Sequence, residues 1–186
     1  MKDGSLASLQ GLDNNGIVIY SGTFSKVLFP GLRLAYIVLP TIEMVYELKK
    51  MKGMMDRQSP ILDQIILAKF IEEGHFLRHI RKMRLLYSER RNILVKLIEE
   101  NLSNYLTIEP SQSGMNLTAW LSEKIDAQKL KEEAKSSGVI IPFINDYSLE
   151  NRIRPAITLG FTAFTKYKLK TGIQKLAACI ESSLIT

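Results

Sequence analysis

Two short runs of β-branched and other apolar residues near the start of the chain constrain its fold most. They are residues 17–21 and 33–39, and each is bounded by turn-forming residues, so we expect two strands, the first of them buried. No further strand pattern follows until residue 106. A lone two-stranded hairpin is marginally stable in water, and its open edges invite pairing with another chain. The pattern therefore predicts that this hairpin is the end of a larger sheet whose earlier strands lie outside this chain.

Helical patterns fill the middle of the chain, and the last part mixes short strands with helices. Thr41 can cap a helix over about 42–54, and Ser59-Pro60 opens another helix that ends at Gly74. The remaining pattern predicts a long amphipathic helix over about 76–102, strands at 106–108, 116–121, 139–141 and 156–161, and helices at about 126–136 and 165–182. Together these elements predict an α/β fold.

The composition indicates a folded protein with few metal ligands. Of the 186 residues, 46% are hydrophobic and 24% are charged, which is typical of a globular chain. No apolar run reaches the roughly 18–20 residues that span a bilayer, and the start of the chain lacks a signal-peptide pattern, so we expect a cytoplasmic protein without membrane contact. Cys179 is the only cysteine, which excludes an internal disulfide. His75 and His79 have no third ligand in the pattern, so we predict no metal site.

The net charge of +6 raises the question of an anionic partner. Basic residues cluster between Arg78 and Arg91, where they alternate with apolar residues at helical spacing. This spacing is typical of a solvated helix face, and no zinc-finger, basic-zipper or RNA-binding signature accompanies it. We therefore expect no direct nucleic-acid contact from this segment; direct binding of DNA would instead show an affinity that falls steeply with salt.

The segment between the first two strands carries the chemistry. Lys26 follows the first strand, Thr23 and Ser25 precede it with two hydroxyl groups, and Arg33 lies at the start of the second strand. A lysine in a partly apolar site loses proton affinity and becomes a nucleophile toward an aldehyde. The two hydroxyls can donate to a phosphate, and an arginine can bind it through its planar guanidinium. Pro30-Gly31 predicts a turn that brings Arg33 back toward the lysine.

The chemistry alone leaves two interpretations open. The first is an anion-binding site in which Lys26 and Arg33 flank a dianion that relieves their mutual repulsion. The second is an ordinary strand, turn and strand with a solvated lysine and arginine. A P-loop is excluded, because the required spacing of two glycines and a lysine is missing.

The same segment resembles a known family. Gly-Thr-Phe-Ser-Lys at 22–26, followed by Phe-Pro-Gly-Leu-Arg-Leu at 29–34, is similar to the cofactor-lysine segment of class I/II, fold-type-I aminotransferases. The block at 70–91, with Glu72-Glu73-Gly74-His75 and Arg81-Lys82-Met83-Arg84, more closely resembles the aminotransferase-like domain of MocR-type transcriptional regulators. The resemblance covers almost the whole chain.

The resemblance implies a cofactor, a reaction and a set of residues. Lys26 would hold pyridoxal 5'-phosphate as a Schiff base and relay protons while an amino group passes to a 2-oxo acid; Thr23, Ser25 and Arg33 would bind the phosphate, and Ser59 could approach it. The alternative is an effector-sensing or dimerisation domain of a MocR-type regulator without turnover. The partners that the resemblance implies are a small amino acid or amine, and a second copy of the chain in a homodimer.

The resemblance also implies a division of the chain: the end of the large, cofactor-lysine domain at 1–58, interdomain helices at 59–104, and a small C-terminal α+β domain at 105–186. Two features depart from the family. Thr158 stands where relatives carry the arginine that binds a substrate carboxylate, and Arg154 could replace it only if the chain bends inward. The aromatic and aspartate residues that hold the cofactor ring would precede residue 1, so we expect the isolated chain to be inactive or weakly active.

Overall fold

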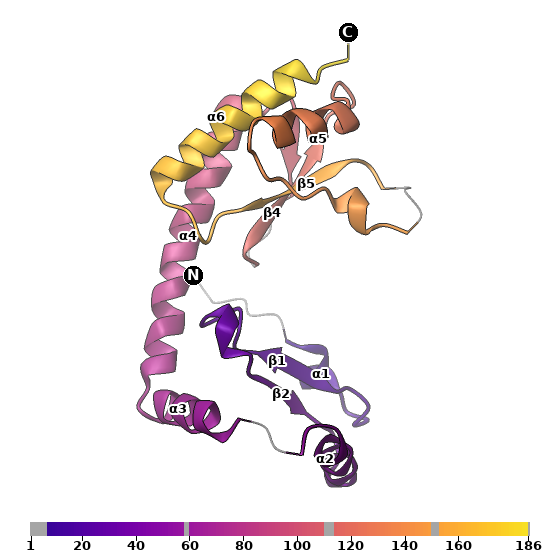
Figure 1. Ribbon diagram of the computed structural model, residues 1–186, viewed down its shortest axis with the longest axis vertical. Coiled ribbons are helices and arrows are strands. Elements are labelled where there is room, and N and C mark those ends of the chain that lie inside the picture. The colour runs from indigo at the N-terminus through magenta and orange to yellow at the C-terminus, as the bar shows by residue number, and fades with distance from the viewer. Residues whose placement is uncertain (1–6, 58–59, 110–113, 150–152, 186) are drawn as a thin grey trace. The chain divides into compact units, whose positions relative to one another are not determined.

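The computed structural model describes residues 7–57, 60–109, 114–149 and 153–185. The chain divides into two compact units, Met1–Ile80 and Arg81–Thr186, which we describe separately (Figure 1). Within the described ranges, no helix is both long and apolar enough to cross a membrane. The mixture of helices and small antiparallel sheets confirms the predicted α/β class. The finer division at 1–58, 59–104 and 105–186 stays a prediction.

Unit 1 is built around a two-stranded antiparallel sheet of β1 (Tyr20–Thr23) and β2 (Ala35–Val38). A short 3-10 helix at Pro30–Leu32 lies in the connection between the strands. The other elements of this unit are the short helix α1 (Leu9–Leu12), α2 (Ile42–Asp56), α3 (Ile61–Glu72) and the first residues of α4 (His75–Leu102). Thr41 caps α2 as predicted, since its hydroxyl accepts the Met44 N–H at 3.3 Å.

The strands of unit 1 correct two expectations. The first strand starts at Tyr20 rather than residue 17, because the Asp13 carboxylate accepts the backbone N–H groups of Ile17 and Val18, each at 2.7 Å, and so removes them from the ladder. The strand is also not buried: its residues are exposed or half-buried. The second strand starts at Ala35, because Arg33 adopts a left-handed conformation with φ of 50°.

The start of α3 is only partly tested. Ser59, predicted to cap this helix, lies outside the described residues. Pro60 stands immediately before Ile61 and makes no side-chain cap. Gly74 ends the helical run with φ of 74°, as a glycine can without steric cost, and α4 starts at the next residue.

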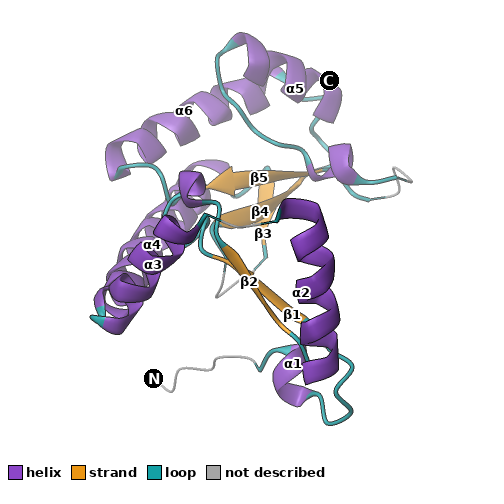
Figure 2. Ribbon diagram, turned by 60° about the horizontal axis from the view of Figure 1, so that its bottom comes forward, coloured by secondary structure: helices purple, strands orange, loops and turns teal. Residues whose placement is uncertain are grey.

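Unit 2 contains a three-stranded antiparallel sheet in the order β3 (Leu106–Ile108), β4 (Asn116–Leu121) and β5 (Ala156–Gly160). The helices α5 (Ala127–Ser136) and α6 (Lys166–Ser182) pack against each other and against this sheet (Figure 2). Apolar side chains from the second half of α4, the strands and both helices form one core, which includes Ile98, Leu117, Leu130, Ile157, Phe161, Leu176, Cys179 and Ile180.

The predicted strand at 139–141 is wrong. The Val139 N–H donates to the Ala134 carbonyl at 2.8 Å and so completes the end of α5 instead of a strand. Pro142 has no N–H to give to a ladder. The Pro142 carbonyl accepts the Thr158 N–H at 2.9 Å, and the next residue, Phe143, forms an isolated bridge to Ile157.

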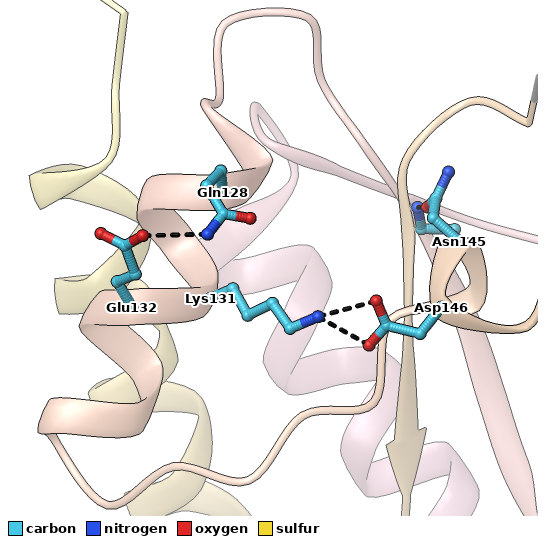
Figure 3. A network of polar contacts seen from close by, with 6 residues as sticks. Gln128, Lys131, Glu132, Asn145 and Asp146 are labelled. Carbon is cyan, nitrogen blue, oxygen red and sulfur yellow. Dashed lines mark hydrogen bonds and ion pairs between the residues drawn. The ribbon is translucent and has the colours of Figure 1, made fainter. Parts of the chain in front are cut away.

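Polar side chains fasten the segment after α5 to the rest of unit 2 (Figure 3). Lys131 of α5 donates to both carboxylate oxygens of Asp146, at 2.7 and 2.8 Å. Asn145, the neighbouring residue, donates to the Ile153 carbonyl at 2.6 Å and accepts the Ala156 N–H at 3.2 Å. The segment that includes the short 3-10 helix Ile144–Tyr147 is therefore held at both α5 and the start of β5.

Candidate functional site

The loop end of the unit 1 hairpin brings together the predicted phosphate-binding residues. β1 and β2 pair so that Thr23 lies opposite Ala35. One further cross-strand bond follows, from the Phe24 N–H to the Leu34 carbonyl at 3.0 Å. Ser25 and Arg33 are therefore the first residues beyond the last cross-strand bond, one on each side of the hairpin. The Pro30-Gly31 turn thus brings Arg33 back to the position across the hairpin from Ser25, and Ser25 immediately precedes Lys26 in sequence.

The two hydroxyl groups are engaged differently. The Thr23 Oγ accepts the Ser25 N–H at 3.2 Å and donates to the Leu34 carbonyl at 3.4 Å. This last distance is near the limit of a hydrogen bond, so the Thr23 hydroxyl can be turned to another acceptor at small cost. Ser25 is half-buried, and its hydroxyl has no hydrogen-bond partner among the described residues. Of the two, Ser25 is the hydroxyl that is ready to donate.

Lys26 lies in a single closed turn. The turn is closed by a hydrogen bond from the Leu28 N–H to the Phe24 carbonyl at 2.8 Å. The lysine side chain is exposed, and no residue in the described ranges forms an ion pair or hydrogen bond with its amine. On the far side of the lysine, the Val27 carbonyl accepts a hydrogen bond from His79 Nε2 at 2.9 Å. The backbone around the lysine is thus fixed while its amine is left available.

Arg33 occupies a strained backbone position. It follows the 3-10 helix Pro30–Leu32, which is closed by the Leu32 N–H on the Phe29 carbonyl at 3.2 Å, and its φ is 50°. A left-handed conformation costs a residue with a Cβ about 1–2 kcal/mol. Strain of this kind persists only where the surrounding structure imposes it, and it is concentrated at functional sites. The guanidinium is exposed and makes no ion pair with any described residue.

Aromatic rings support the site from within unit 1. Tyr36 lies opposite Gly22 in the sheet, and its ring covers this glycine so closely that a Cβ there would come within 2.5 Å of the ring. The Tyr36 ring also contacts Tyr20 and Phe24, with ring centroids 6.0 and 5.4 Å apart. A hydrogen bond with Tyr20, together with some desolvation, raises the pKa of Tyr36 above its ordinary value. Tyr20 and Phe24 thus belong to a partly exposed aromatic cluster.

These residues fit an aldehyde that carries a phosphate. An amine, a guanidinium and a free hydroxyl lie at one hairpin end, and no described carboxylate forms an ion pair with either cation. Such a donor set attracts a dianion, and the amine can react with a carbonyl carbon. Ser25 and Arg33 fit best, and Thr23 fits only if its hydroxyl leaves Leu34. Whether Lys26 and these three residues hold a cofactor stays a prediction.

The predicted substrate residue belongs to unit 2 and is already engaged. Arg154 donates from Nε and Nη2 to the Leu121 carbonyl, at 3.1 and 2.9 Å. Thr158 lies in β5, opposite Thr118 of β4, and its N–H donates a hydrogen bond to the Pro142 carbonyl at 2.9 Å. A carboxylate could bind Arg154 only in competition with this carbonyl, so its role as a substrate residue stays a prediction that these contacts do not favour.

Sequence reasoning missed the contact of His79. The two histidines lie four residues apart on α4 and have different partners. His75 Nδ1 lies 2.7 Å from Arg78 Nη2, whereas His79 reaches the carbonyl next to Lys26. No local signal could reveal the second contact, because His79 is 52 positions away from Val27 along the chain. The parts of the chain that the structure describes contain no cluster of three His, Cys, Asp or Glu residues that could hold a metal ion.

The sequence of this chain is similar to those of MocR-type regulators and of aminotransferases. The sequence matches no family model. It is 34% identical to the probable rhizopine catabolism regulatory protein MocR of Rhizobium meliloti, over 95% of this chain and 36% of that protein. It is likewise 34% identical to an uncharacterized aminotransferase of Saccharolobus solfataricus, over 96% of this chain and 44% of that protein. The chain thus spans less than half the length of these relatives.

A solved structure agrees with the sequence relatives. The kynurenine aminotransferase of Pyrococcus horikoshii, crystallised with PMP, matches 95% of this chain and 44% of its own, with a TM-score of 0.85 and 28% identity. The chain therefore has the fold of a portion of a fold-type-I, pyridoxal-phosphate-dependent aminotransferase. More particularly, it is similar both to aminotransferases and to MocR-type transcriptional regulators, as its lysine segment and helix block predicted.

Proposed function

We propose that this chain provides the cofactor lysine, Lys26, and part of the phosphate site of a protein that binds pyridoxal 5'-phosphate. The observation that carries the proposal is the hairpin end, where the Lys26 turn, Ser25 and the strained Arg33 follow the last cross-strand bond. The similarity to a kynurenine aminotransferase crystallised with PMP supports the same cofactor. The activity belongs to a protein longer than the matched portion, since the relatives are more than twice as long.

Each residue has a defined task in this proposal. When bound, the cofactor supplies an aldehyde that reacts with a lysine amine and a ring that accepts electrons from the substrate carbon. The Lys26 amine provides the covalent attachment and, once released by an incoming amine, moves protons at its Nζ. Arg33 and Ser25 hold the phosphate and so fix the distance between the aldehyde and Nζ. Thr23 joins them when its hydroxyl turns away from the Leu34 carbonyl.

Amino-group transfer to a 2-oxo acid is the first form of this function. It requires a small amino acid or amine as substrate, and we propose a homodimer as the working assembly. The second form is an effector sensor that binds the cofactor and an amine without turnover. One observation favours the sensor: Arg154 is engaged with the Leu121 carbonyl, which leaves a substrate carboxylate without a free arginine at this position. The identities to a MocR regulator and to an aminotransferase are equal, at 34%, and favour neither form.

A visible absorption spectrum tests the proposal. Addition of pyridoxal phosphate to the parent chain should produce a saturable band above the absorbance of the free aldehyde. Lys26→Ala should abolish it, while Lys50→Ala, which removes another exposed lysine of unit 1, should leave it unchanged. Arg33→Met should weaken cofactor affinity by about ten- to a hundredfold, as loss of a charge-assisted pair predicts. An identical band in the parent and in Lys26→Ala would refute the assignment.

The same preparation separates the enzyme from the sensor. An amino acid added to the loaded protein shifts the band in either case. In an aminotransferase, the shift is accompanied by release of a 2-oxo acid, and a second 2-oxo acid restores the original spectrum. In a sensor, the shift occurs without release of an oxo acid and is reversed when the amine is removed.

A further inference from the structure

Among the described residues, four hydrogen bonds hold the turn that carries Lys26, and one of these four comes from another element. Three are local to the hairpin: Ser25 N–H to Thr23 Oγ, Phe24 N–H to the Leu34 carbonyl, and Leu28 N–H to the Phe24 carbonyl. The fourth joins His79 Nε2, on α4, to the Val27 carbonyl at 2.9 Å. Because a carbonyl oxygen can only accept, Nε2 must carry the hydrogen in this contact.

A second residue on the same helix contacts the other side of the turn. Phe76 meets Phe24 edge to face, with ring centroids 5.8 Å apart and an interplanar angle of 71°. Residues three apart lie on one helix face, so Phe76 and His79 reach the hairpin together. Phe24 lies two residues before Lys26 and Val27 one residue after it. The first turns of α4 therefore contact the backbone or side chains on both sides of the lysine.

The other histidine of α4 offers a matched comparison. His75 Nδ1 accepts from Arg78 Nη2 at 2.7 Å, its Nε2 lies 3.2 Å from a Glu73 carboxylate oxygen, and its ring stacks on Phe70. All these partners lie in α3, α4 or the link between them. His75 thus has the same side chain and nearly the same position as His79, but its contacts do not include the Lys26 turn.

We infer that His79 is a positioning residue for Lys26: its Nε2–H fixes the Val27 carbonyl and thereby the orientation of the turn that presents the lysine amine. This inference rests on the proposed function of Lys26. His79 does not need to touch the cofactor or the amine. It acts through the peptide that follows the lysine, because a carbonyl held by a side chain of a neighbouring helix cannot rotate with the rest of the loop.

Two variants separate the hydrogen bond from the ring. His79→Phe keeps an aromatic ring and removes the donor, whereas His79→Gln removes the ring and keeps an N–H near the position of Nε2. His75→Phe is the control. The first readout is the amide hydrogen exchange of Leu28 in the full chain, which reports whether the turn stays closed without any cofactor. The second is the rate at which pyridoxal phosphate, at limiting concentration, becomes fixed to Lys26 on borohydride reduction.

We expect His79→Phe to increase Leu28 exchange and to slow Lys26 trapping by about two- to tenfold, the range for one net hydrogen bond. His79→Gln should recover most of both losses, and His75→Phe should show neither. Equal effects in the Phe and Gln variants, or faster exchange with unchanged trapping, would overturn the positioning role. If the parent chain itself traps no cofactor at Lys26, the proposed function fails; unchanged Leu28 exchange in His79→Phe would overturn the inference separately.

Discussion

The two units of the chain differ in how they bury their apolar side chains. In unit 2, residues from α4, the three strands, α5 and α6 form one continuous core. In unit 1, Leu67 is the only hydrophobic residue among those described that is fully buried, at 7% exposure. Large apolar side chains of unit 1 stay exposed along the hairpin, α2 and α3, including Ile37, Tyr46, Met54, Leu62 and Ile66.

The unit with the larger core is therefore not the unit that contains the candidate lysine. Unit 2 has the packing of a self-sufficient domain, but its one predicted substrate residue, Arg154, is occupied by a backbone carbonyl. Unit 1 holds the candidate lysine on a hairpin whose order comes from hydrogen bonds and a few aromatic contacts rather than a core. Exposed apolar side chains in such number are typical of surfaces that contact other molecules. We therefore expect mutations in the two units to affect different measurements.

The largest expected effect is on the core of unit 2. Ile98→Ala removes a side chain that is 1% exposed and should lower the free energy of unfolding by about 2–5 kcal/mol. Ile66→Ala removes the same group from a position that is 57% exposed and should change it by less than about 0.5 kcal/mol. Urea unfolding followed by far-UV circular dichroism, which reports the helices of both units, makes the comparison. Equal losses would mean that the units do not differ in packing.

Asn145 tests whether the segment after α5 is part of the stable unit. The Asn145 side chain donates to the Ile153 carbonyl and accepts the Ala156 N–H. Asn145→Ala therefore removes the partner of each of these two backbone groups. We expect a loss of about 1–3 kcal/mol in the same unfolding experiment. Asn101→Ala, which removes a single exposed bond to the Leu97 carbonyl, should cost less. If both variants behave alike, the segment is not fastened through Asn145.

Gly22→Ala tests the aromatic cluster of unit 1. The new methyl group would lie within 2.5 Å of the Tyr36 ring, so the ring must move, at a cost of about 1–3 kcal/mol to the hairpin. The hydrogen bond with Tyr20 that raises the pKa of Tyr36 would then be lost, and this pKa should fall back toward its ordinary value. A spectrophotometric titration of the tyrosines measures the change. Gly53→Ala, in an open position on α2, is the control and should leave the titration unaltered.

The smallest expected effect is on the ion pair of Lys131 and Asp146. Both side chains are about half exposed, at 47% and 49%, so solvent screens their attraction. Lys131→Met should lower the free energy of unfolding of unit 2 by only about 0.2–1 kcal/mol. The difference between parent and variant should shrink as salt is added. A loss as large as that of Ile98→Ala would show that this pair, and not the core, organises unit 2.

Sequence reasoning succeeded where local patterns decide the structure. The strands at Leu106–Ile108 and Asn116–Leu121 and the Thr41 cap follow from alternation and side-chain capping, and the structure confirms them. The strand at 17–21 was misplaced because one side chain, Asp13, competes for the backbone N–H groups. Its carboxylate has a lowered pKa for the same reason, led by the bond from Val18.

The candidate site was predictable only in part. Residue types and spacing in 23–33 indicate an anion-binding lysine segment, and the turn explains how Arg33 returns to Ser25. The left-handed backbone of Arg33 gave no signal, since the residue is not a glycine, asparagine or aspartate. The contact of His79 depends on how α4 meets the hairpin within unit 1, which no local pattern encodes.

Reductive trapping tests the central claim most directly. The chain is incubated with a limiting amount of pyridoxal phosphate, reduced with borohydride, digested and mapped by mass spectrometry. The account predicts that the label is concentrated on the peptide containing Lys26, that it saturates, and that it disappears in Lys26→Ala without moving elsewhere. A label spread over the exposed lysines in proportion to their accessibility, with none enriched at Lys26, would contradict it.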